Sequence, residues 1–303
     1  MSQYKTKGDN LATWWQIGSF ILPAIILIAI YIYYPIFKTI QLSFFDWDGI
    51  SEITKKFVGV ANYQTLLGDS VVWKSLGNNL ILVAISLLIE LPLAFLFAYI
   101  LLQNFSKRTS NIFRTLFFIP SILSVVVVSL LWRMIYNYDA GLMNKVLEIA
   151  GLSFLKQSWL GNPFLVLYSI MVVVLWIYIG YYIVLYTAGL RTIPDEIYEA
   201  ALIDGASKRH VLTRITLPLM EELIRTTVLM SMIGSFRYFD LVYVMTKGGP
   251  FRSSELLATY MYDRAFTVRQ MGYGSAIAMM ILVVCLLAAF FENKLTAKKS
   301  IEY

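Results

Sequence analysis

The chain has 303 residues, of which 58% are hydrophobic and 15% are charged, and its formal net charge is +6. Soluble domains carry about 25% charged residues, so this composition excludes an ordinary soluble domain and indicates an integral membrane protein. With one cysteine, Cys285, and one histidine, an internal disulfide and a cysteine–histidine metal cluster are excluded. The basic residues are scattered among hydrophobic runs, so no nucleic-acid-binding patch is predicted.

Six hydrophobic runs reach the length of about 20 residues that a membrane-spanning helix needs. The first is too long and too aromatic for a cleaved signal peptide and is expected to remain as an anchor. Because no long polar linker divides the runs, we predict an all-α, polytopic helical bundle that forms a single domain over residues 1–303. The expected spans are residues 15–37, 78–102, 113–136, 164–189, 220–246 and 271–292.

The basic residues between the runs indicate an orientation, because cytoplasmic loops carry an excess of lysine and arginine. With both termini inside, the cytoplasmic segments hold twelve: Lys5, Lys7, Lys107, Arg108, Arg114, Arg191, Lys208, Arg209, Arg214, Lys294, Lys298 and Lys299. The outer segments hold ten, spread over longer loops: Lys38, Lys55, Lys56, Lys74, Lys145, Lys156, Lys247, Arg252, Arg264 and Arg269. The count predicts cytoplasmic termini.

Several charged residues lie inside the runs. The fifth run holds Arg225, Arg237 and Asp240, and the second holds Glu90, two residues before Pro92. A helix with such residues cannot face lipid on every side, so protein or a water-filled cavity should cover its charged faces. Arg237 and Asp240 are expected to pair with each other or with a partner. For Glu90 two interpretations remain, a functional carboxyl or a structural hydrogen bond to a neighbouring helix.

The longest part of the second half that is not a hydrophobic run reads EIYEAALIDGASKRHVLTRITLPL, residues 196–219. Pro194 suits the first position of a helix. Gly205 permits the left-handed residue that commonly ends a helix, and Ser207 can cap a second helix that must end near Pro218. The pattern predicts a helix–glycine–helix elbow. It would either lie on the membrane surface or dock on another protein.

The apex of this elbow favours close approach by a partner. Ala200 and Ala201 leave little side chain there, and Glu199 offers a charge for a partner cation. His210 is expected to serve surface packing. Its basic neighbours are expected to serve only charge sorting across the membrane: Lys208, Arg209 and Arg214.

The elbow resembles the EAA loop of the permease subunits of binding-protein-dependent ABC importers. That family has Glu-Ala-Ala, then Asp-Gly-Ala, and then Ile-x-Leu-Pro. The matching residues are Glu199, Ala200, Ala201, Asp204, Gly205, Ala206, Ile215, Leu217 and Pro218. The chain departs from the family at Leu212, usually an aromatic residue, and at Glu222, often a proline. KGGPFRSSELLATYMYDRAF and VGVANYQTLL also look like carbohydrate importers, so the resemblance covers nearly the whole chain.

The resemblance implies six transmembrane helices with a cytoplasmic coupling helix in the loop 191–219, between the fourth and the fifth. Glu199, Ala200, Ala201, Asp204 and Gly205 would couple the chain to a cytoplasmic ATPase. The implied partners are a second, maltose-G-like permease, two copies of the ATPase and an extracytoplasmic solute-binding protein. The implied solute is a carbohydrate, in particular an oligosaccharide. The implied location is the cytoplasmic membrane of a bacterium or an archaeon.

No Gly-x-x-x-x-Gly-Lys-[Ser/Thr] loop occurs in the sequence. We therefore predict that the chain is not an enzyme and binds no cofactor or metal, with ATP and magnesium held by the partner ATPase. Two alternatives remain. An ion-coupled secondary transporter would need intramembrane acids, for which Glu90 and Asp240 are available, and an ABC permease could carry a non-sugar solute such as glycerol phosphate.

Two stripes could line a path for a sugar, whose C–H faces pack on aromatic rings and whose hydroxyls need hydrogen bonds. One lies in the fourth run, where three tyrosines at i, i+3 and i+4 share a face: Tyr178, Tyr181 and Tyr182. The other lies in the fifth run: Ser231, Ser235 and Tyr238. The alternative is that both stripes join helices, since serine and other small polar residues also hold membrane helices together.

Overall fold

The computed structural model describes residues 7–296 and divides the chain into two compact units. The first comprises residues 1–68 and 263–279, and the second comprises residues 69–262 and 280–303. Lys5, Lys298 and Lys299, which entered the orientation count, lie outside the described residues.

The first unit begins with a long helical run made of α1 (Lys7–Ile28), the π-helical turn η1 (Ala29–Tyr33) and α2 (Tyr34–Leu42). Residues 17–42 are long and apolar enough to cross a membrane, and within the chain none of that window is buried. Phe20, for example, is 86% exposed. A run of exposed apolar side chains is compatible only with lipid or another protein as its surroundings.

The rest of the first unit is a compact cap. It contains the strands β1 (Phe45–Asp46) and β2 (Lys56–Phe57), which pair antiparallel, the helix α3 (Ala61–Gly68), the π turn η5 (Asp263–Thr267) and the start of α16 (Met271–Thr296). The amide of Asn62 donates to the carbonyls of Ser43 and Phe45, both at 2.9 Å. A Cβ on Gly272 would lie 1.8 Å from the Phe45 carbonyl oxygen, so α16 approaches this strand only because residue 272 is glycine.

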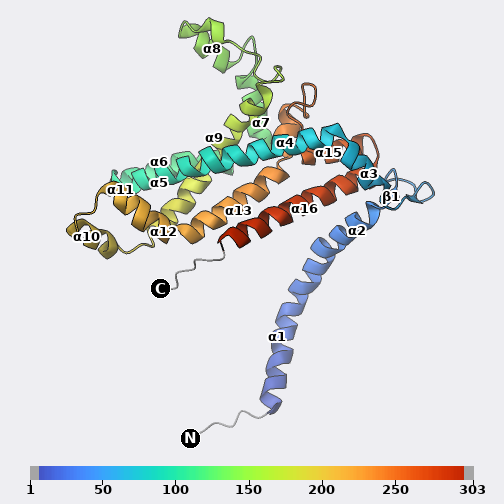
Figure 1. The fold of residues 1–303 in the computed structure, drawn as a ribbon, viewed down its shortest axis with the longest axis horizontal. Helices are drawn as coiled ribbons and strands as arrows, with labels where there is room; N and C mark the ends of the chain where they lie inside the picture. The colour runs from blue at the N-terminus through green and yellow to red at the C-terminus, as the bar shows by residue number, and fades with distance from the viewer. Residues whose placement is uncertain (1–6, 297–303) are drawn as a thin grey trace. The chain divides into compact units, whose positions relative to one another are not determined.

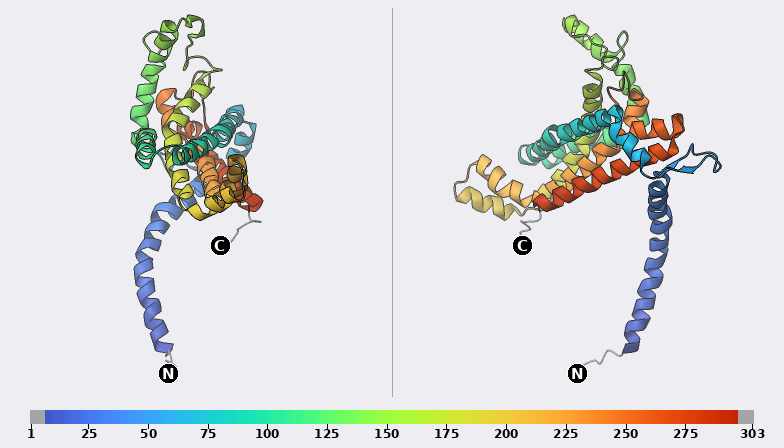
Figure 2. Two further views of the ribbon diagram at one scale, coloured as in Figure 1. Left: turned by 90° about the vertical axis from the view of Figure 1, so that its left-hand side faces the viewer. Right: turned by 45° about the vertical axis from the view of Figure 1, so that its right-hand side comes forward.

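The second unit is a helical bundle with two side arms. Its elements, besides the end of α16, are α4 (Ser70–Ile85), η2 (Ser86–Glu90), α5 (Leu91–Gln103), α6 (Lys107–Ile122), α7 (Val125–Ile135), α8 (Leu142–Ile149), η3 (Ser153–Leu155), α9 (Val166–Leu190), α10 (Asp195–Ile203), α11 (Lys208–Val211), η4 (Leu212–Thr216), α12 (Leu217–Leu219), α13 (Glu221–Arg237), α14 (Asp240–Met245) and α15 (Leu257–Tyr262). One arm carries α8, and the other is the elbow of α10 and α11 (Figures 1 and 2).

Helix α9 forms the centre of the bundle. It packs against α5, α6 and α13 and is apolar around its whole circumference, as expected of a helix covered on all sides. One apolar core surrounds its first half with residues from α4, α7 and α14, and a second surrounds its later half with residues from α5. Tyr186, 1% exposed, fixes α9 to α13 through a 2.7 Å hydrogen bond with Thr227.

Prolines explain three of the π-helical turns. Turns η1, η2 and η4 end at Tyr33, Glu90 and Thr216, and each is followed two residues later by a proline: Pro35, Pro92 and Pro218. Proline lacks an N–H and its ring clashes with the carbonyl four residues earlier. A single wide turn relieves both problems without ending the helix, and such turns often occur at functional sites.

The helices can be compared with the expected spans. Within residues 7–296, five helices are long and apolar enough to cross a membrane, covering residues 17–42, 70–103, 166–190, 221–245 and 271–294. The stretch expected as one span over 113–136 differs. It consists of α6 and α7, which meet at an angle of 96° and make a sixth span if counted together. Pro120 lies in the last turn of α6 and Leu123 is extended, with ψ of 147°, so the helix cannot continue straight.

A polar clasp holds the bundle at the end that carries α15. The side chain of Asn78 donates to the carbonyls of Ser253 and Glu255, at 3.1 and 2.8 Å. The neighbouring Asn79 donates to the Ser235 carbonyl at 2.7 Å and accepts from the Leu257 N–H at 3.0 Å. Helix α4 is thereby tied to both α13 and α15. Buried amides satisfied in this way fix the register of packed helices.

Candidate functional site

The elbow is built around a glycine. Helix α10 ends at Ile203 with Asp204 as its C-cap, and Gly205 follows with a φ of +75°, a value that glycine adopts without steric cost. The N–H of Gly205 bonds to the Leu202 carbonyl at 3.0 Å and that of Ala206 to the Ala201 carbonyl at 2.9 Å. This pair of bonds is the Schellman motif, which closes a helix and reverses the chain.

The second helix of the elbow starts at a serine cap. The hydroxyl of Ser207 accepts from the His210 N–H at 3.3 Å, and α11 begins at Lys208. His210 is exposed and its ring lines neither of the pockets described below. The elbow therefore forms from the residues that were expected to form it.

Helix α10 presents an apolar surface that the sequence analysis did not identify. Glu199, Ala200, Asp204 and Gly205 are exposed, whereas Ala201 is only 7% exposed and points into the fold. The next two residues are large, apolar and exposed: Leu202 at 64% and Ile203 at 86%. Helical periodicity gives the relative positions of these residues, but the side that faces the bundle depends on what α10 packs against.

Packing against the bundle fixes how α10 is turned. Ile197 and Tyr198 join the second apolar core, and the Tyr198 hydroxyl lies 3.4 Å from that of Thr216. A polar pocket of about 450 Å³ lies at the base of the elbow. Its lining residues are Tyr99, Leu102, Gln103, Leu190, Arg191, Thr192, Ile193, Pro194, Asp195 and Tyr198. The elbow thus projects from the bundle, with Ile197 and Tyr198 packed against the second apolar core at its base.

The two polar stripes meet inside the bundle. The ring of Tyr178 on α9 lies 5.7 Å from that of Tyr238, which directly follows α13. Tyr182 of α9 lies close to Ser231 of α13. Tyr182 and Ser231 are 7% and 4% exposed. Tyr178, Tyr182, Ser231 and Tyr238 therefore form one cluster, which we call the tyrosine cluster.

The other two stripe residues are placed differently. Ser235 is wholly buried, and its hydroxyl donates to the Ser231 carbonyl one turn earlier, at 2.9 Å. Its own carbonyl accepts from Asn79, so Ser235 serves the packing of α4 on α13. Tyr181 is half-buried and packs edge-on against Tyr182, with ring centroids 5.4 Å apart.

Arg237 and Asp240 do not pair with each other among the described residues, and the other expectation, pairing with a partner, stays a prediction. Helix α13 ends at Arg237 and α14 begins at Asp240, because Tyr238 adopts an extended conformation with ψ of 117°. This break removes the two residues from a common helical face. Both are exposed, and within residues 7–296 no ion pair joins them.

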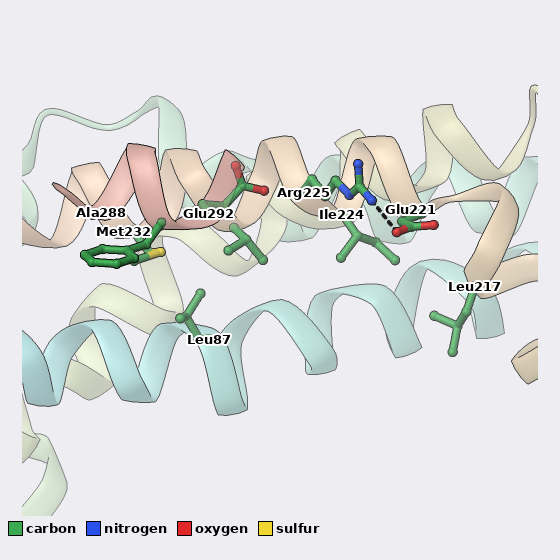
Figure 3. Close-up of a pocket in the computed structure, with 10 residues that line it drawn as sticks. Leu87, Leu217, Glu221, Ile224, Arg225, Met232, Ala288 and Glu292 are labelled. Atoms are coloured by element: carbon green, nitrogen blue, oxygen red, sulfur yellow. Dashed lines mark hydrogen bonds and ion pairs between the residues drawn. The ribbon is translucent and has the colours of Figure 1, made fainter. Parts of the chain in front are cut away.

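An apolar groove of about 500 Å³ runs between η2, α13 and α16 (Figure 3). Leu87, Met232 and Ala288 line one part of it, whereas Glu221 and Arg225 form an ion pair of 2.5 Å at the other. Arg225 is a charged residue inside a membrane span. Its position is explained by the ion pair with Glu221 and by the groove, which keeps its side chain from facing lipid alone. Its complete lining is Leu87, Leu217, Glu221, Ile224, Arg225, Val228, Met232, Ala288, Phe291 and Glu292.

The described residues offer little for metal chemistry. Between residues 7 and 296, no three histidine, cysteine or acidic side chains come together in a group that could hold a metal ion.

Comparison with known proteins agrees with this geometry. A family model described as "Binding-protein-dependent transport system inner membrane component" matches residues 90–300. The probable ABC transporter permease protein YurN of Bacillus subtilis is 37% identical over 275 residues, which cover 91% of this chain and 94% of that protein. The multiple sugar-binding transport system permease protein MsmF of Streptococcus mutans is 31% identical, with coverage of 92% and 94%.

The fold also matches a solved structure. A chain in the crystal structure of a bacterial alginate ABC transporter, in complex with an alginate pentasaccharide-bound periplasmic protein, superimposes with a TM-score of 0.83. The alignment covers 95% of this chain and 96% of that chain, at 23% sequence identity. The all-α membrane fold predicted from the sequence is thereby confirmed.

Proposed function

This chain belongs to the family of binding-protein-dependent transport system inner membrane components, and we propose that it is the permease subunit of an ATP-driven importer of an oligosaccharide. The observation that carries the solute class is the tyrosine cluster. Aromatic rings and hydroxyls in the middle of a membrane bundle suit a sugar, which has apolar C–H faces and a rim of hydroxyls. The name of the relative MsmF, a multiple sugar-binding system, supports the same class.

The proposed partners follow from the elbow and from the family. We assign the exposed face of α10 to a cytoplasmic ATPase, of which the complete importer would hold two copies that bind ATP and magnesium. The rigid Schellman turn and the exposed Leu202 and Ile203 support this assignment, because protein interfaces are centred on desolvated apolar residues. A second permease would complete the path, and an extracytoplasmic protein would deliver the sugar.

The proposed location is the cytoplasmic membrane, with both termini and the elbow on the cytoplasmic side. ATP-driven closure of the two ATPases would move the elbows, and the helices packed on their bases would then reorient. Such transmission needs a stiff connection, which the anchoring of Ile197 and Tyr198 in the bundle core supports.

The deciding experiment measures uptake of a panel of labelled oligosaccharides into proteoliposomes that contain the complete complex and its binding protein. We expect uptake that requires ATP inside the vesicle and persists when ion gradients are collapsed. Uptake driven by an ion gradient without ATP would instead identify a secondary transporter. ATP-driven uptake of glycerol phosphate, without uptake of any oligosaccharide, would contradict the proposed solute class and leave the ATP-driven mechanism standing.

Coupling is tested separately with Glu199→Lys. Glu199 is exposed on α10, so its replacement should leave folding and insertion unchanged. We expect the ATPases no longer to co-purify with this variant, because a positive charge would replace the negative charge offered to the partner. Wild-type recovery of the ATPases with Glu199→Lys would contradict the assignment of this face.

A further inference from the structure

One oxygen of a buried carboxyl group next to the tyrosine cluster has no hydrogen-bond partner among the described residues. Glu90 is 1% exposed, and its Oε1 atom forms no hydrogen bond within residues 7–296. Ser86, one turn earlier on the same helix, lies close to the carboxyl group. Buried polar atoms are nearly always hydrogen-bonded, so a carboxyl oxygen left without a bond indicates that something outside the described chain satisfies it.

The π turn η2 sets the position of this carboxyl. Glu90 is the last residue of η2, which packs against both α9 and α13. On another side of the same turn, Leu87 lines the apolar groove (Figure 3). The turn therefore separates the groove from the tyrosine cluster and contributes a side chain to each.

The carboxyl lies among tyrosines from two helices. It lies close to Tyr178 and Tyr182 of α9 and to Tyr238, which directly follows α13. Tyr186, which is hydrogen-bonded to Thr227, is also close to the carboxyl group. Glu90 therefore lies beside the tyrosine cluster, close to the point where the rings of Tyr178 and Tyr238 make contact.

Within residues 7–296 no cation compensates the carboxyl group. Among the described residues, no lysine, arginine or histidine forms an ion pair with Glu90. Arg225 is paired with Glu221, and Arg237 is exposed beyond the end of the cluster. A structural hydrogen bond to a neighbouring helix, one of the two interpretations of Glu90, is not present among the described residues, where the nearby hydroxyl belongs to Ser86 on the same helix.

We propose that Glu90 is a specificity-determining residue of the transport path, which accepts hydrogen bonds from the hydroxyls of a neutral oligosaccharide and rejects acidic sugars. Sugar hydroxyls are donors that supply what Oε1 lacks, and the neighbouring tyrosine rings supply the stacking surface. A uronate carboxylate would stand beside Glu90 without a cation to separate the two acids. Repulsion of this kind is how sites discriminate against a competing ligand.

This inference rests on the proposed function, and its test uses the assembled complex with the second permease and the ATPases. The binding protein is left out, so that only the membrane path selects. Two matched trisaccharides serve as probes, neutral maltotriose and acidic trigalacturonate, and saturation-transfer NMR measures their affinities. We expect wild type to bind maltotriose at least tenfold more tightly than trigalacturonate. The variant Glu90→Gln should bind maltotriose about ten- to a hundredfold more weakly and lose the discrimination, because hydrogen bonds to charged acceptors are the stronger ones.

Thermal unfolding of the same complexes separates this role from a structural one. Glu90→Met replaces the unsatisfied oxygen with an apolar group of similar length, so the midpoint temperature should stay equal or rise while maltotriose binding is lost. The matched control is Glu255→Gln. Glu255 is also buried, at 4% exposure, but its oxygens bond to Arg252 and Thr259. This control should lower the midpoint temperature and leave the ratio of the two affinities unchanged.

Three results would overturn the inference. They are unchanged affinities in Glu90→Gln, a lower midpoint temperature in Glu90→Met, and a wild-type complex that binds trigalacturonate as well as maltotriose or binds neither. Failure of the proposed function would look different. The ATPases would then not co-purify and no ATP-driven uptake would occur, whereas failure of this inference alone leaves both intact.

Discussion

At the residue scale, the conformation of Gly205 decides whether the elbow forms. A Cβ at this position would meet no atom within 4 Å, so space does not restrict the side chain. The restriction comes from the backbone, since a φ of +75° is strained for other residues and most strained for β-branched ones. Asparagine tolerates this region far better than valine does.

This contrast gives the first prediction. Gly205→Val should abolish transport and recovery of the ATPases, because the Schellman bonds that orient the elbow cannot form. Gly205→Asn should retain at least half of the recovery. The measurement is quantitative co-purification of the ATPases from membranes that contain equal amounts of each variant. Equal recovery with valine and with asparagine would show that the turn conformation is irrelevant to docking.

The exposed apolar residues of α10 give the second prediction. Burying a side chain such as that of isoleucine contributes about 1.5–3 kcal/mol, and each 1.4 kcal/mol is tenfold in affinity. Ile203→Ser should therefore weaken ATPase binding about ten- to a hundredfold, measured by titrating purified ATPase onto the permease pair. Ile149 on α8 is the matched control, because its side chain is 87% exposed and that of Ile203 is 86% exposed. If Ile149→Ser weakens binding as much, the effect is not specific to the elbow.

These residues also mark what the sequence could predict of the site. The EAA pattern located the elbow and its glycine, because turn chemistry is local. It placed Ala200 and Ala201 together at the apex, whereas the packing of Ile197 and Tyr198 turns Ala201 inward and exposes Leu202 and Ile203. The rotation of a helix about its axis is set by tertiary contacts, which a single sequence does not specify.

At the element scale, the hydrophobic runs predicted where the long helices lie but not their internal breaks. Turns η1, η2 and η4 precede prolines, and this signal was available in the sequence. The 96° bend between α6 and α7 was not predictable, because Pro120 could equally have been accommodated by a π turn like the others. The break after Arg237 likewise depends on the extended conformation of Tyr238, which no local pattern requires.

Close contact between α6 and α9 gives the third prediction. A Cβ on Gly180 of α9 would lie 1.8 Å from the Phe117 carbonyl oxygen of α6, so the helices touch through their backbones. Membrane helices associate through such small residues. Gly180→Ala should force the pair apart and lower the midpoint of thermal unfolding by several degrees, since overpacking costs about 1–3 kcal/mol.

Gly234 on α13 is the control for this contact, because a Cβ there would meet nothing within 4 Å. Gly234→Ala should leave the midpoint unchanged or raise it slightly, since alanine favours the helix over glycine. Scanning fluorimetry of the two variants in the same detergent makes the comparison. A midpoint for Gly180→Ala at or above that of Gly234→Ala would mean that the contact between α6 and α9 is not tight.

At the scale of the whole molecule, composition alone determined the class of protein, since 58% hydrophobic residues leave no alternative to a membrane fold. The family was predicted from the EAA pattern and is confirmed by the match over residues 90–300. The tyrosine cluster shows the limit of such reasoning. Each stripe was visible in one helix, but the contact of Tyr178 with Tyr238 depends on how α9 and α13 cross.

The orientation of the molecule gives the last prediction, which rests on the count of basic residues and on the proposed docking of the elbow. Lys208 at the start of α11 and Lys145 on α8 are both exposed, so a cysteine at either should be reachable by a thiol reagent without disturbing the fold. Native Cys285 is first replaced by alanine, because it is a free and partly exposed thiol. In intact cells a membrane-impermeant maleimide should label Lys145→Cys and not Lys208→Cys. In inside-out vesicles the pattern should reverse.

Opposite labelling would place the elbow outside, where it could never meet an ATPase that consumes cytoplasmic ATP. Both the topology and the coupling assignment would then fail together.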